Sequence, residues 1–261
     1  MNRKISSLFA PILFFCIIIF SWELLLDLKN IPHYIIPKPS LIIITLIEEW
    51  ETLFPALIVT INVTFLALFL AILLGVFVAV LISQFRIIEI SIMPYTVILQ
   101  VTPVIAIAPL IIILVDNTFT ATLICAWLVA FFPILSSTLI GLKSVNHDLQ
   151  DLFKLYQANR LQKLLFLQLP SALPYCLSGF KISAGLSLIG AIVSEFVTGI
   201  GGSSSGLAYI IIESSYRLEI PKMFASLVLI ALTGVLIYLL AHIISNFALR
   251  NWHESAKLKE F

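Results

Sequence analysis

Six long apolar stretches follow one another along the chain, with the polar residues gathered mainly between them. They cover residues 8–28, 54–82, 90–115, 118–142, 177–200 and 224–249. Each stretch reaches about the 20 residues that an α-helix needs to cross the hydrocarbon core of a membrane. The pattern therefore predicts an all-α integral membrane protein with about six spanning helices.

Composition supports this assignment. Of the 261 residues, 61% are hydrophobic and only 11% are charged, whereas charged residues make up about a quarter of an average globular domain. A cleaved signal peptide is the alternative interpretation of the first stretch, because Arg3 and Lys4 precede it. That stretch is long, however, and it ends without a small-x-small cleavage site, so we expect an uncleaved first helix.

The basic residues predict the orientation in the membrane, because loops rich in lysine and arginine are retained on the cytoplasmic side. If the N-terminus lies inside, only Lys29, Lys38, Arg217 and Lys222 fall on the outer side. The other eleven of the 15 lysines and arginines, Lys181 among them, are then assigned to the inner side. We therefore expect both termini and residues 143–176 to be cytoplasmic.

Prolines interrupt the third stretch at positions 94, 103 and 109. Kinks of this kind are tolerated in a spanning helix where neighbouring helices satisfy the freed carbonyl groups. We therefore expect a kinked helix at the centre of the bundle, with Pro103 and Pro109 as candidates for the translocation path. An equally good interpretation of each proline is that it only shapes how the helices pack. Residues 41–53 are expected to form a short helix along the outer membrane surface.

Glu195 is the clearest ionisable residue at membrane depth. A charge there costs about 3 kcal/mol on insertion scales, so such residues are functional candidates. Two readings stay open from the sequence: Glu195 lines the translocation path, or it bonds a neighbouring helix.

Signatures of enzyme chemistry are missing from the sequence. It has no phosphate-binding glycine loop, no nucleophile elbow and no pair of histidines with a carboxylate at metal-ligand spacing. The three cysteines likewise show no metal or redox spacing. We expect a non-catalytic chain that cannot hydrolyse ATP by itself and that needs no cofactor or metal.

The long charged interruption at residues 148–174 also carries apolar side chains. Leu149, Leu152, Phe153 and Tyr156 recur at the i, i+3, i+4, i+7 spacing of one helix face. An apolar face outside the membrane marks a contact surface. The segment is therefore expected to dock a soluble partner.

This segment resembles the EAA motif of binding-protein-dependent ABC importer permeases, which reads Glu-Ala-Ala, three residues, Gly, nine residues and Ile-x-Leu-Pro. The chain has Asp151-Leu152-Phe153, then Gln157, then Leu167-Gln168-Leu169-Pro170, at the same spacing. Ala158, Arg160 and Pro174 also suit the motif. Leu152, Phe153 and Gln157 depart from its small residues.

The resemblance extends over nearly the whole chain and points to the nitrate, sulfonate and taurine branch of these permeases. It rests on residues 36–40, 103–109, 131–133 and 194–196 and on Gly206-Leu207. It implies a type I ABC importer transmembrane domain spanning residues 1–261, with a cytoplasmic coupling loop at residues 143–176. The implied substrate is a nitrate-, sulfonate- or taurine-like anion or a thiamine-type pyrimidine precursor, carried across the bacterial inner membrane by alternating access.

The partners that the resemblance implies are a second copy of the chain, two cytoplasmic ATPase subunits and an outer substrate-binding protein. The coupling loop is expected to fold as two short helices around a turn and to insert into a groove on the ATPase. Because Gln157 replaces the turn glycine, we expect a looser turn or one that relies on Asn159. The bulk of Leu152 and Phe153 implies a deeper groove on the ATPase.

Two other classes of function stay open from the sequence. One is a secondary transporter that uses Glu195 for ion or proton coupling, and the other is an integral-membrane enzyme. The glycine- and serine-rich residues 199–206 are expected to form an outer loop that is either simply solvated or a mobile gate.

Overall fold

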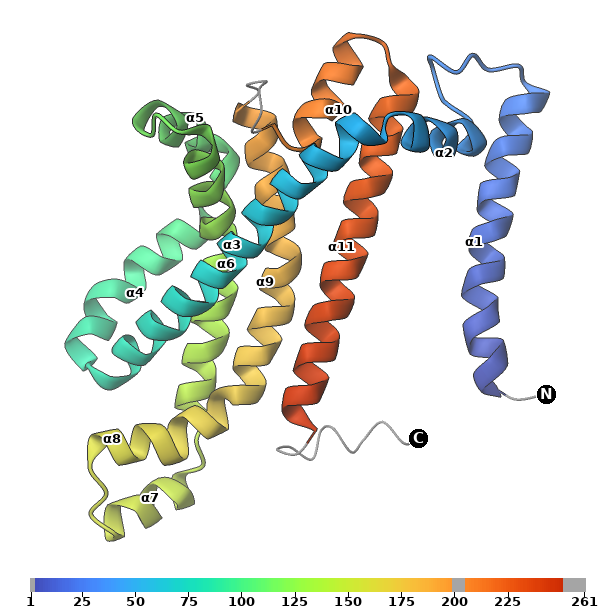
Figure 1. Cartoon of the computed structure of the whole chain (residues 1–261). Coiled ribbons are helices and arrows are strands. Elements are labelled where there is room, and N and C mark those ends of the chain that lie inside the picture. The colour runs from blue at the N-terminus through green and yellow to red at the C-terminus, as the bar shows by residue number, and fades with distance from the viewer. Residues whose placement is uncertain (1–2, 199–204, 251–261) are drawn as a thin grey trace.

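The computed structural model describes residues 3–198 and 205–250, without the side chains of residues 3–10, 12 and 105. All regular elements in these ranges are helices (Figure 1). In chain order they are α1 (Arg3–Leu28), α2 (Pro39–Glu48), α3 (Trp50–Gln84), α4 (Arg86–Val101), α5 (Val104–Leu114), α6 (Thr118–Lys143), α7 (His147–Leu155), α8 (Arg160–Lys163), the π-helix η1 (Leu164–Gln168), α9 (Leu169–Thr198), α10 (Leu207–Tyr216) and α11 (Ile220–Leu249).

Within the described residues, four helical segments are long and apolar enough to cross a membrane. They are α3, α6, the continuous run Arg160–Thr198 and α11, which match the second, fourth, fifth and sixth apolar stretches. The first stretch forms the 26-residue helix α1, whose role as a span stays a prediction. The bent pair of α4 and α5 adds a fifth crossing if the two helices are counted as one broken span.

The third apolar stretch is two helices rather than one. Thr102 is extended (φ −73°, ψ 123°), as expected for a residue before proline, and Pro103 precedes the first turn of α5. α4 and the Ala106–Leu114 part of α5 are bent by 107° at this break. The third stretch was expected at the centre of the bundle, and this is wrong for the single chain. Its first helix, α4, lies at the edge of the bundle and has no buried side chain (Figure 1).

The centre of the bundle is the contact between α6 and α9, with α3 and α11 packed against them. A Cβ atom on Gly179 of α9 would lie 2.9 Å from the Pro133 carbonyl oxygen of α6, so only glycine permits this approach. Close to it, the Ser183 hydroxyl donates to the Ala130 carbonyl at 2.6 Å. In lipid, helices are held together by small residues and interhelical hydrogen bonds. Apolar side chains gain little there, because the lipid tails that they leave are as apolar as the protein interior.

The segment from α7 to α8 lies at the same end of the bundle as the start of α1 and the end of α11 (Figure 1). At this end, Glu89 pairs with Arg86 at 3.0 Å and with Lys143 at 2.6 Å, which ties α4 to α6. α2 and α10 lie at the opposite end (Figure 1). The expected surface helix at residues 41–53 is the shorter α2, and Glu49 separates it from α3.

Candidate functional site

The charged segment after α6 forms a helical hairpin, here called the α7–α8 hairpin and comprising residues 147–163. At its start, the Asn146 side chain accepts a hydrogen bond from the Asp148 backbone N–H at 2.9 Å, a common helix N-cap. On the exposed polar side of α7, Asp151 and Lys154 form an ion pair at 2.8 Å. The hydrogen bond from Lys154 lowers the pKa of the Asp151 carboxyl group.

The turn of the hairpin is tighter than the sequence led us to expect. Gln157 takes a left-handed conformation with φ 50°, its N–H donates to the Lys154 carbonyl, and the Ala158 N–H donates to the Phe153 carbonyl. These two bonds define a Schellman motif, in which glycine is the usual left-handed residue. Of the two expected alternatives, the looser turn is wrong, because Gln157 adopts the glycine conformation. The other alternative, a turn that relies on Asn159, agrees with the capping box that Asn159 forms directly after it.

The second arm of the hairpin begins with a capping box. The Asn159 side chain accepts from the Gln162 N–H at 2.8 Å, and the Gln162 side chain accepts from the Asn159 N–H at 2.8 Å. The chain then passes through the π-helix η1, where the Leu169 N–H bonds to the Leu164 carbonyl. Pro170 explains the irregular turn, because proline lacks an N–H and crowds the carbonyl four residues earlier.

An open apolar groove of about 300 Å³ is lined by residues of the hairpin and by Phe166 of η1. Leu152 and Phe166 are exposed by 44% and 70% respectively and both line it. The full lining is Leu152, Phe153, Tyr156, Ala158, Gln162 and Phe166. The expectation of one apolar face is therefore refined, because Leu149 does not line the groove and the second arm contributes to it.

The other motif residues occupy different surroundings. Asp151, Gln157 and Arg160 are exposed, and Leu169 and Pro170 are half-buried. Leu167 is only 5% exposed, so it is not available to a partner. We interpret Leu167 as an anchor of the hairpin to the membrane bundle, held next to Gln168, whose amide accepts from Gln84 of α3 at 2.7 Å.

The left-handed Gln157 makes the turn sensitive to side-chain shape. Gln157→Val is expected to loosen it, because a β-branched residue is a genuine outlier at positive φ. Hydrogen–deuterium exchange of residues 153–158 should become about fivefold faster or more, corresponding to about 1 kcal/mol. Gln157→Gly is the matched control and should not accelerate exchange. Equal exchange in the Val and Gly variants would contradict the left-handed turn.

Glu195 lies at the other end of the bundle, where α3, α9 and α10 meet. One carboxylate oxygen accepts from the Thr60 hydroxyl of α3 at 2.8 Å, and the other accepts from the Ala208 N–H in the first turn of α10 at 3.0 Å. Thr60 in turn accepts from the Leu207 N–H at 3.0 Å. Glu195 and Thr60 thus satisfy backbone donors that begin α10, where a negative charge is favoured by the helix dipole.

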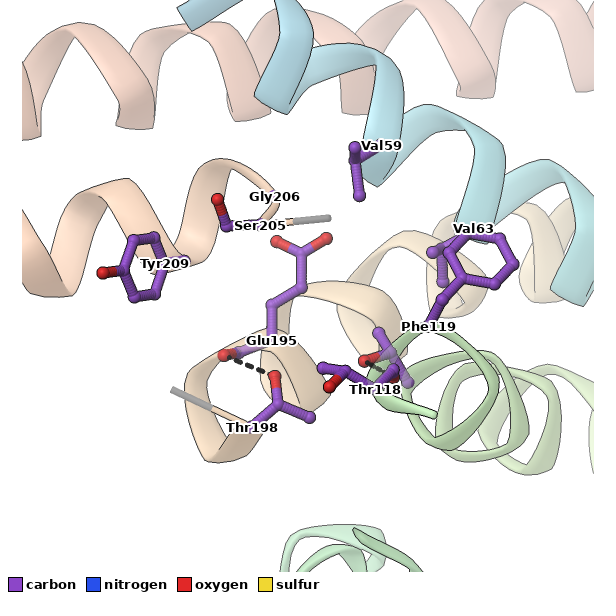
Figure 2. A pocket seen from close by; sticks show the side chains of 10 residues that line it. Val59, Val63, Thr118, Phe119, Glu195, Thr198, Ser205, Gly206 and Tyr209 are labelled. Carbon is purple, nitrogen blue, oxygen red and sulfur yellow. Dashed lines mark hydrogen bonds between the residues drawn. The ribbon is translucent and has the colours of Figure 1, made fainter. Parts of the chain in front are cut away.

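Gly206 is required by this arrangement. Figure 2 shows the Glu195 carboxylate directed at the start of α10, beside Gly206. A Cβ atom on Gly206 would lie 2.2 Å from the carboxyl carbon of Glu195. As the N-cap residue, Gly206 offers no side-chain cap of its own, so Glu195 takes that role from another helix. The rest of the expected glycine- and serine-rich loop, residues 199–204, lies outside the described residues.

The cavity beside Glu195 is small. Its volume is about 10 Å³, which is about enough for one water molecule. Its lining is Val59, Val63, Thr118, Phe119, Thr122, Glu195, Thr198, Ser205, Gly206 and Tyr209 (Figure 2). Pro103 and Pro109 do not line it and are exposed, so this cavity does not bring the three translocation-path candidates together.

Three features of these sites escaped the sequence analysis. The helix α10 was not among the expected elements, although the apolar run at residues 207–212 was a signal for it. Thr60 shows no sequence signal, because it lies 135 residues from Glu195. Lys181 was counted with the inner flank of a span, but it lies within α9, 12 residues past the helix start.

Comparison with known proteins agrees with the architecture. Residues 71–251 match the family described as binding-protein-dependent transport system inner membrane component. The formylaminopyrimidine transport permease protein ThiX of Halalkalibacterium halodurans is 31% identical over 237 residues, which cover 90% of this chain and 92% of that protein. SsuC of Bacillus subtilis, named as an aliphatic sulfonates transport permease protein, is 27% identical over 90% of this chain and 84% of its own length.

A solved structure shares the fold. The crystal structure of an amino acid ABC transporter with histidines superposes with a TM-score of 0.62 at 19% identity, covering 77% of this chain and 96% of that one. This supports the expected type I importer transmembrane fold. From the family match and the fold together, the chain belongs to the binding-protein-dependent transport system inner membrane component family, the multi-pass permeases of ABC transporters.

Proposed function

We propose that this chain is the membrane-spanning permease subunit of an ATP-driven importer in a bacterial inner membrane. It works as a homodimer with two cytoplasmic ATPase subunits and an outer substrate-binding protein. Its own contribution is mechanical, through alternating access, and ATP hydrolysis takes place on the partner ATPase. The observation that carries this proposal is the α7–α8 hairpin, which presents an apolar groove outside the spanning helices.

The α7–α8 hairpin is the coupling element in this proposal. Leu152 and Phe153 line its groove and receive an apolar projection of the ATPase, since exposed apolar surface of this kind marks a contact site. Asp151 and Arg160 lie exposed for polar contacts at the rim. Gln157 and Ala158 hold the turn, and Leu167, Leu169 and Pro170 join the hairpin to α9, so that a push on the hairpin reaches the bundle.

The names of two relatives support a proposal for the substrate class. They refer to a formylaminopyrimidine and to aliphatic sulfonates. We infer a small solute of one of these two kinds, a nitrate-, sulfonate- or taurine-like anion or a thiamine-type pyrimidine precursor.

A secondary transporter that couples ions through Glu195 is the rival proposal. It has less support, because both carboxylate oxygens of Glu195 already accept hydrogen bonds from protein groups. The adjoining cavity holds only about one water molecule. These features favour a structural role for Glu195 at the start of α10.

The test of the proposed function is uptake in a strain that lacks the chromosomal system, with the chain expressed with and without its ATPase and binding protein. Radiolabelled taurine and a formylaminopyrimidine are the probes. Uptake of at least one probe should require all three components, and the purified chain alone should show no ATPase activity. Uptake by the chain alone would instead support the secondary transporter.

The orientation is tested by cysteine accessibility in intact cells. We expect Ser204→Cys to react with a membrane-impermeant maleimide from outside and Lys154→Cys to react only after the cells are opened. The physical reason is the excess of basic residues on one side. The reverse pattern would place the hairpin outside and remove it from any cytoplasmic ATPase.

A further inference from the structure

Lys181 is half-buried and lies near the middle of the bundle's length. It is two residues from Ser183, whose hydroxyl donates to the Ala130 carbonyl at 2.6 Å. Ala130 is near the middle of α6, about 18 Å from one end and about 20 Å from the other at a rise of about 1.5 Å per residue. Lys181 is therefore close to the midplane of the spanning helices, too far from either end for its side chain alone to reach the membrane surface.

The charge of Lys181 has no anionic partner among the residues that the structure describes. Within the described part of the chain, the Lys181 ammonium has no ion pair and no hydrogen bond. α6 and α11 contain no acidic residue, and α3 carries only Glu51 in its first turn. Glu195, on the same helix, is about 21 Å further along and is engaged at the start of α10.

Lys181 borders a face of α9 that the single chain leaves uncovered. This open face of α9 consists of Ser178, Ile182, Gly185 and Ile189, spaced for one side of a helix. Ile182 and Ile189 are each 53% exposed, and a Cβ atom on Gly185 would meet nothing within 4 Å. Ser178 and Gly185 lie at i−3 and i+4 from Lys181, so they are its nearest neighbours along this surface.

The open face of α9 differs from a lipid-facing surface elsewhere in the molecule. The exposed side of α11 over the corresponding depth consists largely of hydrocarbon side chains, among them Leu232, Val235, Leu236, Leu239, Leu240 and Ile243. On α9, a serine, a glycine and an adjoining ammonium replace such residues. Because a charge facing the hydrocarbon core is costly, charged residues there almost always face the bundle interior or water.

We propose that the open face of α9 borders a water-filled passage between two copies of the chain, and that Lys181 supplies the positive charge that attracts an anionic solute into it. This rests on the proposed function as a homodimeric permease and narrows its substrate to the anionic class. The partner of Lys181 is the transported anion rather than a protein carboxylate. Because this pairing is not part of the protein's own structure, the solute is free to leave.

The test uses the full chain in native membrane fragments, where both membrane faces are open to reagents. Ile182→Cys and Gly185→Cys are made after replacing Cys16, Cys125 and Cys176 by alanine. Each is treated with an anionic and a cationic methanethiosulfonate of similar size. Val235→Cys, on the exposed side of α11, is the control for a lipid-facing position.

Both α9 cysteines should react, whereas Val235→Cys should not. The ratio of anionic to cationic reaction rates should fall about tenfold when Lys181→Met is added, because a single charge acts strongly over a few ångströms outside bulk water. Lys181→Arg keeps the charge and should keep the ratio. Unreactive α9 cysteines, or a ratio that Lys181→Met leaves unchanged, would overturn the proposal. The labelling does not depend on ATP, so a failure of ATP-dependent uptake would count against the proposed function and not against this result.

Discussion

Leu152→Asp is expected to abolish co-purification of the partner ATPase and to reduce ATP-driven uptake to background. Burying an apolar side chain of this size typically contributes about 1.5 to 3 kcal/mol, so its loss weakens the complex by roughly tenfold to more than a hundredfold. The buried carboxylate adds a desolvation cost. The membrane bundle should stay folded, because Leu152 is 44% exposed in the groove of the α7–α8 hairpin.

Leu155→Asp is the matched control. It places the same charge on the same helix, at a residue that is 81% exposed and does not line the groove. We expect it to retain ATPase binding and uptake. Pull-down of a tagged ATPase, with size-exclusion profiles of each variant, gives the measurement. If Leu155→Asp releases the ATPase and Leu152→Asp does not, the groove is not the docking surface.

Glu195→Ala is expected to lower the melting temperature and the yield of the chain. It removes the acceptors of the Thr60 hydroxyl and the Ala208 N–H, and hydrogen bonds to charged groups typically contribute about 1.5–3 kcal/mol each. Glu195→Gln should retain most of the stability and the uptake, because the amide oxygen can accept from Ala208 while the Thr60 hydroxyl turns to accept from the amide NH₂. Thermal unfolding in nanodiscs and uptake are the two readouts. A Gln variant with full stability and no uptake would show that the charge itself serves transport.

Gly206→Ala tests the same contact between Glu195 and the start of α10, now from the α10 side. Its Cβ atom would be 2.2 Å from the Glu195 carboxyl carbon, so either the carboxylate or the start of α10 has to move, and overpacking of this kind typically costs about 1–3 kcal/mol. We therefore expect a lower melting temperature. Gly185→Ala is the control, because a Cβ there meets nothing within 4 Å, and it should not reduce stability. Equal behaviour of the two variants would argue against the close contact.

Local patterns were enough for the elements that depend on neighbours in the sequence. The stretch at residues 118–142 became α6 (Thr118–Lys143) almost without change, because an uninterrupted apolar run in lipid has to satisfy its backbone groups within one helix. The apolar spacing around Leu152 likewise predicted α7. Both features follow from periodicity within a few helical turns.

Some expectations were wrong at residues that can adopt either of two backbone conformations. The prolines of the third stretch were expected to kink one helix, but Pro103 separates α4 from α5, whereas Pro94 and Pro109 lie inside their helices. Gln157 was expected either to loosen the turn or to make it rely on Asn159, and the Schellman hydrogen bonds hold Gln157 at positive φ with Asn159 capping the next helix. In each case the surrounding packing and hydrogen bonds decide between conformations of similar energy.

By itself, the sequence determined the membrane class, most of the spanning helices, the hairpin and the family resemblance, because each is encoded by residues close together in the chain. Only the tertiary structure decided which groups Glu195 contacts, since its partner Thr60 is 135 residues away and the bond from the Leu207 N–H to Thr60 spans 147 residues. The same holds for Lys181, whose depth depends on the contact of α9 with Ala130 of α6. Which side chains meet across helices is set by how the helices pack, and apolar spans that all look alike in sequence carry little information about that packing.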